Sequence, residues 1–385
     1  MRGQLRYLCS LDELRCESLA WDDLWYRSGT SAPVARAELI AQWIETFSPG
    51  VDLQALVVES EGQLVAALPL VGGSKAKLLR VGMLPRNDWS RCGDLLWDSS
   101  AGPEPLDLIL RGLRRMPWSV MWLDRVAFDE PHWQEFLKAL GRARLPWNLH
   151  TQARFGVVDC RADWTDLQAA WSKKHRHNMR GARRKAESEG ELKLQVRQDF
   201  CSPEEVADLV RRGFEIEDRS WKGTIAGSSV LKSAGMLDFL TRQAQQLAQW
   251  GQLQLVFLEL SGRPMAFEFG WCAKGVYFTP KIGYDETFSR FSPSQLLRYE
   301  LFERFHEEQA VQFVDFAGEQ TDATAKWCTG DYPVGRLVFG CGSLFSRAIM
   351  NGYDKFRHFR ETCPTETVAR NPRLPLPEPA TTSSP

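Results

Sequence analysis

Residues 275–316 read GVYFTPKIGYDETFSRFSPSQLLRYELFERFHEEQAVQFVDF, and this stretch predicts a strand, a helix and a second strand. Val276 to Tyr284 is rich in β-branched and aromatic side chains, which is typical of a strand. After a polar segment, a helix is predicted from Pro293 or Ser294, because apolar residues recur every four positions (Leu297, Leu301 and Phe305). Residues 311–316 indicate a buried strand. Together these elements form a βαβ unit, which is almost always right-handed.

The start of the predicted helix is a candidate anion site. Unpaired backbone N–H groups and the positive end of the helix dipole meet there. We therefore expect the phosphates of a cofactor to bind at the loop and first helical turn. The residues concerned are Arg290, Phe291, Ser292, Ser294, Gln295 and Leu296.

Pro280 lies inside the first strand of this unit, and proline cannot donate to a sheet ladder. We expect a bulge or an edge there, and a bulge would open a gap beside the next strand. Lys281, Tyr284 and Asp285 follow at the carboxyl end of the strand, where open α/β sheets bind their ligands. Asp285 could accept a proton from an incoming amine, or it could be a turn residue that accepts backbone N–H bonds.

Four further charged residues are candidates for chemistry. Glu268 interrupts the apolar run 265–271 and faces the same way as Ala266. If buried, it would have a raised pKa suited to a general base, although a solvent-facing position is slightly favoured. Asp315 and Glu319 lie at or just beyond the second strand and could bind substrate. Lys326 could stabilise negative charge on a carbonyl oxygen.

The composition is that of an ordinary globular chain of 385 residues, with 43% hydrophobic and 25% charged residues and a net charge of -1. This length favours two domains. Nine cysteines without a CxxC pair argue against a disulfide framework and against a metal site. No apolar run is long enough for a transmembrane helix, so we expect a cytoplasmic protein. Catalytic motifs of hydrolases, dehydrogenases and kinases are absent from the sequence.

The first half mixes helices and strands. Helices are predicted at 11–28, 35–47, 106–115 and 132–143, and short strands at 78–84, 95–97 and 119–123. Residues 56–68 predict a hairpin, and residues 253–271 predict a second one. Glu59, Gly62 and Ala66 recur as Glu259, Gly262 and Ala266 at a constant offset of 200, which is compatible with a duplicated α/β domain or with coincidence.

The second half begins with a strand at 155–160 and one long helix at 164–188. A strand at 192–197, helices at 203–217 and 236–250 and a loop at 222–233 precede the hairpin. A short helix at 322–327, a strand at 334–339 and an amphipathic helix at 344–359 follow the central unit. From Pro364 the chain is rich in proline, and we expect this tail to be disordered. The predicted divisions are therefore 1–150, 151–343, 344–362 and 363–385.

Basic residues crowd the predicted helix around 173–185, and they include Arg176 and Arg180. Three interpretations are open. The residues could form a solvated face, they could bind nucleic acid, or their positive field could attract an anionic substrate such as a nucleotide-sugar or a lipid-linked phosphate. Nucleic-acid binding is the least favoured, because only Trp171 is available nearby for base stacking.

Four segments, taken in order, resemble the CelD-like acyltransferases of the GNAT superfamily, which are related to the Fem peptidoglycan aminoacyltransferases. The segments are Trp171–Val196, Leu258–Gly270, Lys281–Glu303 and Val314–Trp327. Weaker similarity extends over Trp21–Leu149, including Trp43–Phe47 and Val65–Leu70.

The resemblance implies an α/β fold with mixed sheets and two GNAT-like domains in tandem. It also implies an acyl-CoA donor, acetyl-CoA or another, whose pyrophosphate binds at 290–296. Lys281, Asp285 and Lys326 match positions of the family pattern. Most GNAT proteins have a glycine-rich phosphate loop, however, whereas this chain has Arg-Phe-Ser-Pro-Ser-Gln at 290–295.

The function expected from the resemblance is transfer of an acyl group to an amine or hydroxyl of a sugar or of an envelope or exopolysaccharide precursor. Catalysis would rest on positioning and oxyanion stabilisation, without a covalent enzyme intermediate. Two alternatives remain open. One is aminoacyl transfer from a charged tRNA, which would bind the basic helix. The other is a catalytically inactive scaffold that binds polysaccharide-synthase machinery.

Overall fold

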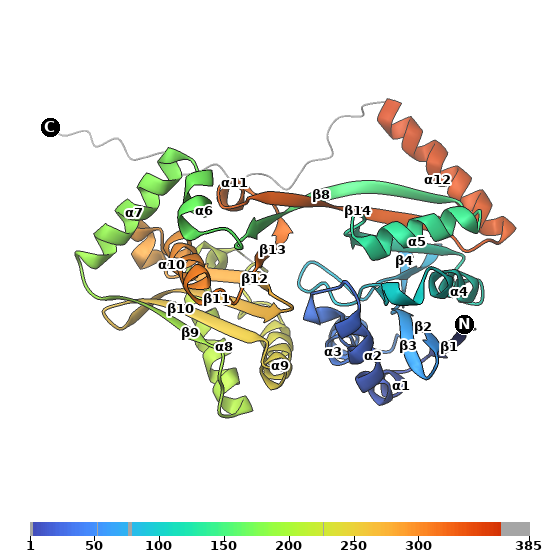
Figure 1. Cartoon of the computed structure of the whole chain (residues 1–385), viewed down its shortest axis with the longest axis horizontal. Helices are drawn as coiled ribbons and strands as arrows, with labels where there is room; N and C mark the ends of the chain where they lie inside the picture. Colours follow the sequence, from blue (N-terminus) through green and yellow to red (C-terminus); the bar gives the residue numbers. More distant parts are fainter. Residues whose placement is uncertain (1–2, 52, 76–78, 226, 363–385) are drawn as a thin grey trace.

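The computed structural model describes residues 3–51, 53–75, 79–225 and 227–362. The chain has a mixed α/β fold with two sheets (Figure 1). The smaller sheet has the order β1-β2-β3-β6 (Gln4–Leu8, Ala55–Ser60, Gln63–Leu68 and Leu96–Trp97). The larger sheet has the order β4-β5-β7-β14-β8-β13-β12-β11-β10-β9 (Val71–Lys75, Leu79–Met83, Val120–Val126, Gly330–Gly340, Trp147–Asp159, Phe313–Glu319, Val276–Tyr284, Arg263–Ala273, Leu253–Leu260 and Leu192–Arg197).

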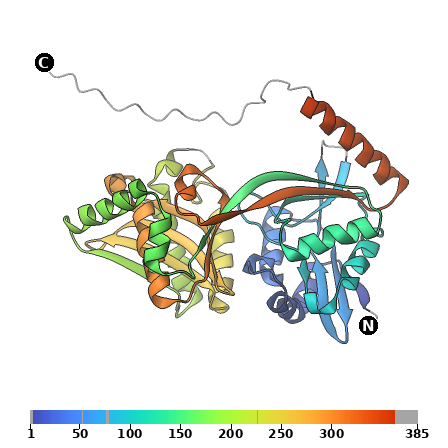
Figure 2. The same cartoon turned by 45° about the horizontal axis from the view of Figure 1, so that its top comes forward.

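Two long strands, β8 and β14, connect the first half of the chain to the second (Figures 1 and 2). They pair antiparallel from Gly330↔Val157 to Phe339↔Trp147, and β14 also pairs with β7. Position 150, the expected domain boundary, therefore lies inside β8. β14, the last of the described strands, returns to the first half, so the large sheet belongs to both halves.

The helices of the first half are α1, α2, α3, α4 and α5 (Leu11–Cys16, Ser18–Arg27, Ala37–Phe47, Glu104–Leu113 and Pro131–Arg142). The prediction of a single helix at 11–28 is wrong, because the helix is interrupted at Glu17, whose carboxylate binds Arg6 of β1. The prediction of a single helix at 164–188 is also wrong. This segment forms two helices, α6 (Trp164–Ala170) and α7 (Lys173–Glu187), because Trp171 turns inward to pack on Trp327 and Ser172 caps α7.

In the second half, helices cover both faces of the large sheet. α8 and α9 (Pro203–Asp218 and Met236–Gln249) pack on one face, where they share a hydrophobic core with α1, α2 and α3. α7 and α10 (Pro293–Glu308) pack on the other face and form a separate core. The central βαβ unit predicted from the sequence is confirmed as β12, α10 and β13, with β12 and β13 parallel.

The repeat detected in the sequence corresponds to two hairpins of the same geometry. Glu61 and Gly62 have φ angles of 53° and 79° in the β2–β3 turn, and Ser261 and Gly262 have φ angles of 51° and 76° in the β10–β11 turn. Both hairpins also have a register shift at the same place, after Val58↔Ala66 in the first and after Leu258↔Ala266 in the second. A shared turn and a shared bulge favour duplication over coincidence.

The C-terminal part contains α11 (Asp322–Ala325), β14 and α12 (Leu344–Thr362), which is longer than the helix predicted at 344–359. The predicted tail at 363–385 lies outside the described residues. Among the residues that are described, none of the helices is both long enough and apolar enough to span a membrane.

Candidate active site

A gap opens between the parallel strands β12 and β13. They pair only at three positions, from Val276↔Phe313 to Phe278↔Asp315. Just beyond this point β12 contains one extra residue relative to β11, because Phe278 pairs with Trp271 but Lys281 pairs with Phe269. The bulge expected at Pro280 is confirmed. It turns the Lys281 side chain to the same face of the sheet as Phe278.

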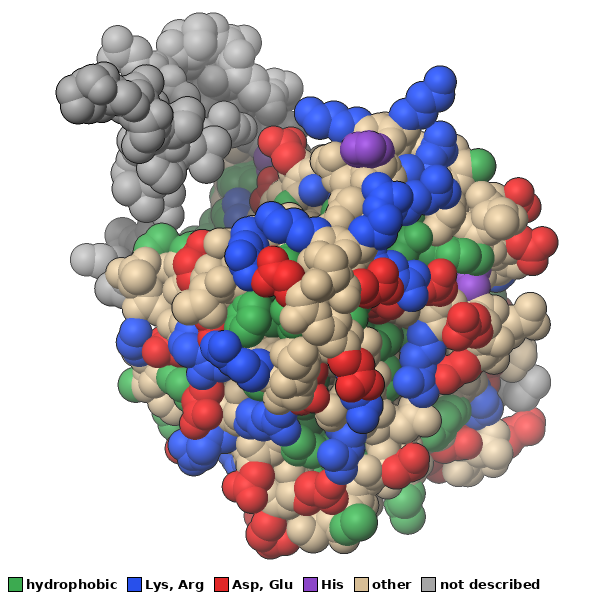
Figure 3. All heavy atoms as spheres, turned by 90° about the vertical axis from the view of Figure 1, so that its left-hand side faces the viewer, with side chains coloured by type: hydrophobic (Ala, Val, Ile, Leu, Met, Phe, Trp, Pro, Cys, Tyr) green, Lys and Arg blue, Asp and Glu red, His purple; other side chains and the backbone are tan. Residues whose placement is uncertain are grey.

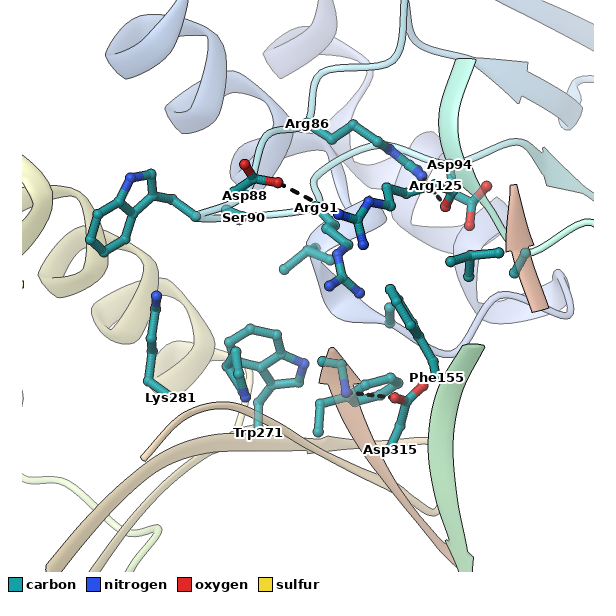
Figure 4. A pocket seen from close by; sticks show the side chains of 18 of the residues that line it. Arg86, Asp88, Ser90, Arg91, Asp94, Arg125, Phe155, Trp271, Lys281 and Asp315 are labelled. Atoms are coloured by element: carbon teal, nitrogen blue, oxygen red, sulfur yellow. Dashed lines mark hydrogen bonds and ion pairs between the residues drawn. The ribbon is translucent and has the colours of Figure 1, made fainter. Parts of the chain in front are cut away.

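A cavity of about 160 Å³ lies on this face beside the gap. Its floor is formed by strands of the second half, and its roof by the segment 86–94 and Arg125 of the first half (Figure 4). Aromatic side chains make up much of its wall (Trp89, Phe155, Trp271, Phe278 and Tyr332). The sequence alone did not indicate the roof residues, because they lie 156 to 195 positions from Lys281 in the chain.

Arg91 and Lys281 extend into the cavity from opposite walls (Figure 4). The Arg91 guanidinium lies 4.0 Å from the ring centre of Phe155, and Lys281 Nζ lies 4.3 Å from that of Trp89. Burial lowers the pKa of Arg91 to about 10 and that of Lys281 to about 8. Both residues are half-buried. A partly desolvated cation without an ion-pair partner costs free energy, and an anionic ligand would relieve that cost.

Asp315 lies on the same face, at the last paired position before the gap. Its carboxylate accepts hydrogen bonds from the Tyr332 hydroxyl at 2.7 Å and from the Ala317 backbone N–H at 2.6 Å. Burial raises the pKa of Asp315, although both hydrogen bonds act in the opposite direction. A carboxyl group with a raised pKa beside a ligand-sized cavity is suited to general base catalysis.

A second, basic cleft of about 500 Å³ lies on the opposite face, between α7 and the start of α10. α10 runs antiparallel to β12, so its first turn lies at the end of the sheet where the gap opens. Four cations line this cleft: Lys174, Lys185, Arg290 and Lys326. Figure 3 shows the Lys and Arg side chains that gather over α7.

The first turn of α10 offers fewer free amides than expected. Pro293 has no N–H, and the amides of Gln295 and Leu296 both donate to Ser292 O, at 2.9 and 3.0 Å. Within the described segment 292–296, this leaves the backbone N–H of Ser294 open to a ligand. Ser292 has a left-handed backbone with φ 52°, where glycine is the usual residue. Side-chain cations would therefore provide most of the contacts to any anion bound there.

His175 contributes an unusual group to this cleft. It is 4% exposed, lies between Trp171 and Trp327, and its Nε2 has no hydrogen-bond partner among the described residues. Burial, together with the nearby Lys326 charge, lowers its pKa to about 4. His175 is therefore neutral at pH 7 and provides a polar atom rather than a charge.

The structure brings together only part of the predicted site. Lys281 and Asp315 line the cavity, whereas Arg290, Ser292, Gln295 and Lys326 line the basic cleft. Lys326 is exposed in that cleft and is not among the residues lining the cavity that contains Lys281. Phe291 and Leu296 are buried in the core, and Ser294, Tyr284 and Glu319 line neither space.

Asp285 and Glu268 have structural partners. Asp285 accepts hydrogen bonds from the N–H and hydroxyl of Thr287 and from Arg219 Nε. Burial alone would raise the pKa of Asp285, but these bonds hold it below its usual value, so Asp285 is a turn residue. Glu268 is 0% exposed, so the slightly favoured solvent-facing position is wrong. Its carboxylate accepts from Tyr277 at 2.9 Å and lies 3.5 Å from Arg298, and burial raises its pKa as expected.

Arg176 and Arg180 also have partners within the protein. Arg176 Nη1 donates to the backbone carbonyls of Gln168, Ala169 and Trp171, which closes the end of α6. Arg180 Nη2 lies 3.4 Å from the side-chain oxygen of Gln168. Neither residue lines the basic cleft or the cavity.

Residues 173–327 match the family described as acetyltransferase (GNAT) domain, over less than half of the chain. These residues form a GNAT acetyltransferase domain. The chain thus carries a transferase of the acyl-transferring type, and the fold class predicted from the sequence is confirmed. A search of curated protein sequences finds no match.

Several solved structures share this fold across both halves. FemX aligns with 88% of this chain and 97% of its own at a TM-score of 0.59 and 10% identity. L-PGS from Bacillus licheniformis aligns with 86% of this chain and 95% of its own at 0.52 and 13% identity. The C-terminal domain of a putative lysylphosphatidylglycerol synthetase from Agrobacterium fabrum aligns with 88% of this chain and 96% of its own at 0.51 and 12% identity. At these identities the similarity concerns the fold alone.

Proposed function

We propose that this acyltransferase takes an acyl group, most simply acetyl, from acyl-CoA and transfers it to an amine or hydroxyl of an acceptor bound in the cavity between the halves. The observation that carries this proposal is the β12–β13 gap. A basic cleft lies on one face of the sheet there, and a cavity lined by hydrogen-bond donors lies on the other. Acyl-CoA suits this arrangement, because it has a charged, phosphorylated end for the basic cleft and a thin acyl-bearing arm that could reach the gap.

The CoA phosphates would bind in the basic cleft. Because the first turn of α10 has so few free amides, Lys185, Arg290 and Lys326 would replace the backbone contacts of a glycine-rich loop. Side-chain cations on the surface are screened by salt more strongly than buried groups are. The affinity for acetyl-CoA should therefore fall as ionic strength rises. This position also gives Lys326 a role in donor binding rather than in oxyanion stabilisation.

Transfer would take place at the gap. The acceptor nitrogen or oxygen attacks the thioester carbonyl carbon, the C–S bond breaks, and CoA leaves as the thiolate. Asp315 would accept the proton lost by the acceptor, a role that the sequence had suggested for Asp285. That proton would then pass to the CoA thiolate or to solvent. The remaining catalysis would come from positioning the two substrates.

Calorimetric titration with acetyl-CoA tests the donor. We expect binding in the wild type and affinity losses of about fivefold for Lys185→Ala and for Lys326→Ala, the size of an exposed charge interaction. Lys193→Ala removes an exposed lysine of β9 and is the matched control. No binding at about 1 mM acetyl-CoA would overturn the acyl-CoA proposal.

A second donor is considered because of α7. Lys173, Lys174, Arg184 and His177 are exposed on this helix next to the cleft, and a polyanion could bind along them. The second proposal is an aminoacyl-tRNA donor, as in the Fem relatives suggested by the sequence. Strongly salt-dependent tRNA binding together with no acetyl-CoA binding would favour it.

The wider role also belongs to this proposal. Membership of the CelD-like group, a sugar or an envelope or exopolysaccharide precursor as acceptor, polysaccharide-synthase machinery as partner and a cytoplasmic location all remain predictions. The inactive-scaffold alternative predicts binding of a partner without turnover. Release of free thiol from acetyl-CoA in the presence of an acceptor would exclude it.

A further inference from the structure

We propose that the acceptor is an anionic carbohydrate unit, in which one ring carries a phosphate or carboxylate group that Arg91 and Lys281 bind from opposite walls of the cavity. That this ligand is the acyl acceptor rests on the proposed function, whereas its binding to the cavity does not depend on that function. Its test therefore needs no acyl donor.

The positive charge inside the cavity is only partly balanced by the protein. In the described part of the chain, neither Arg91 nor Lys281 has a hydrogen bond or an ion pair; each has an aromatic ring instead. Arg86, by contrast, donates to the carbonyls of Gly93, Asp124 and Arg125 and has a structural role.

Carboxylates near the cavity offset these two cations only in part: burial lowers the pKa of each, and the opposing effect of Asp315 on Arg91 and of Glu217 on Lys281 is smaller. Asp88 lies 3.9 Å from Arg125, but its side chain is 99% exposed. Asp94 accepts a hydrogen bond from the Trp133 indole at 2.8 Å and lies near His132. Asp315 accepts hydrogen bonds from Tyr332 and Ala317 and forms no ion pair with Arg91 or Lys281. The groups left open are therefore cations, which favours an anionic ligand.

The Trp271 indole is a third hydrogen-bond donor in the cavity without a partner in the described part of the chain. The Trp271 side chain is 6% exposed and lines the cavity, and its indole Nε1 has no hydrogen-bond partner among the described residues (Figure 4). A buried N–H without a partner costs free energy. The three open groups are all donors, so the ligand that satisfies them must be rich in acceptor oxygens.

The size and walls of the cavity indicate a single ring. A cavity of roughly 150 Å³ holds a benzene ring, and this one measures about 160 Å³. Its aromatic walls provide flat apolar surfaces, while its open donors require oxygen atoms. A sugar ring offers C–H faces and oxygen-bearing edges together, and an acidic substituent adds the charge. Any longer chain attached to that ring would extend out of the cavity.

Calorimetry with three probes tests this inference: glucose 1-phosphate, glucuronate and glucose. We expect glucose 1-phosphate or glucuronate to bind about tenfold or more tightly than glucose, because hydrogen bonds to charged groups are worth more than neutral ones. The first two probes distinguish phosphate from carboxylate. Equal affinity for all three, or no binding of either anion at about 10 mM, would overturn the inference.

Variants assign the binding to the two cations. Arg91→Gln and Lys281→Gln should each weaken binding of the anionic probe about tenfold, and Arg80→Gln, which removes an exposed cation outside the cavity, should leave it unchanged. Equal losses in all three variants would contradict the assignment. Thermal unfolding midpoints verify that each variant folds, and Arg91→Lys keeps the charge if Arg91→Gln does not fold. Acetyl-CoA titrated into the same samples separates the two proposals, because loss of anion binding alone leaves the donor site intact.

Discussion

The hydroxyl of Tyr332 on β14 donates a 2.7 Å hydrogen bond to the carboxylate of Asp315 on β13, across the intervening strand β8. This bond joins the long strand shared by both halves to the edge of the gap. It also lowers the pKa of a carboxyl group that burial otherwise raises. The protonation of Asp315 is therefore linked to Tyr332.

Changing Tyr332 should shift the acid limb of the activity profile. A general base works only when deprotonated, so activity rises as pH rises through the pKa of Asp315. Tyr332→Phe removes a bond that favours the carboxylate, and the limb should move to higher pH by about one unit. The measurement is kcat against pH.

Replacement of Asp315 provides the companion measurement. Asp315→Asn should lower kcat by about 10²–10⁴-fold, the usual contribution of a general base, with little change in KM for the donor. Asp285→Asn is the comparison, since that carboxylate is bound by Arg219 and Thr287, and it should affect stability more than kcat. The opposite ranking would return the base role to Asp285.

Lys281 should make anion binding depend on pH. Burial lowers its pKa to about 8, so below pH 8 it is charged and above pH 8 it becomes neutral. A bound anion favours the charged form, so affinity for glucose 1-phosphate should be flat from about pH 7 to 8 and then fall by up to tenfold per pH unit. Lys281→Arg should bind equally well across this range. An affinity independent of pH in the wild type would contradict the assigned contact.

Replacing Ser292 by glycine should make the folded protein more stable. The left-handed conformation costs a residue with a Cβ about 1–2 kcal/mol, and part of this gain is offset by the greater freedom of glycine in the unfolded chain. Ser292→Gly should therefore raise the free energy of unfolding by about 0.5–1 kcal/mol, measured with urea. Ser294→Gly, in the first turn of α10, is the matched control and should lower it.

The buried pair of Glu268 and Arg298 should be structural. Glu268→Gln leaves the Arg298 guanidinium, 7% exposed, without its carboxylate, and loss of one partner from a buried pair costs about 3–5 kcal/mol. Urea unfolding should show this loss. The double change Glu268→Met and Arg298→Met should recover much of it. A large fall in kcat at unchanged stability would instead restore Glu268 as a catalytic base.

The local features of the βαβ unit could be predicted from sequence because they depend on local chemistry. Pro280 cannot take part in a regular ladder, and the bulge appears at that residue. The burial of Glu268 was not predicted in this way, because the sequence slightly favoured a solvent-facing side chain and the residue is 0% exposed. The offset of 200 between the hairpins was visible because turn residues have strict backbone requirements.

The partners of each side chain were not predictable in the same way. Asp285 was a candidate base until the fold placed Arg219 against it. Arg91 and Trp271 belong to different halves of the chain, and no sequence pattern relates them. One signal was available for α7: Ser172 in Trp-Ser-Lys-Lys-His is a typical N-cap, and it marks the start of a new helix inside the predicted one.

The position of β14 has a consequence for how the protein is made. β7 is translated early, but one of its sheet neighbours is β14, whose residues leave the ribosome some 200 positions later. Until then β7 and β8 each present an unpaired edge, and such edges associate with other chains. We expect nascent chains that end before Gly330 to aggregate or to recruit chaperones, whereas chains that reach Gly340 can close the sheet.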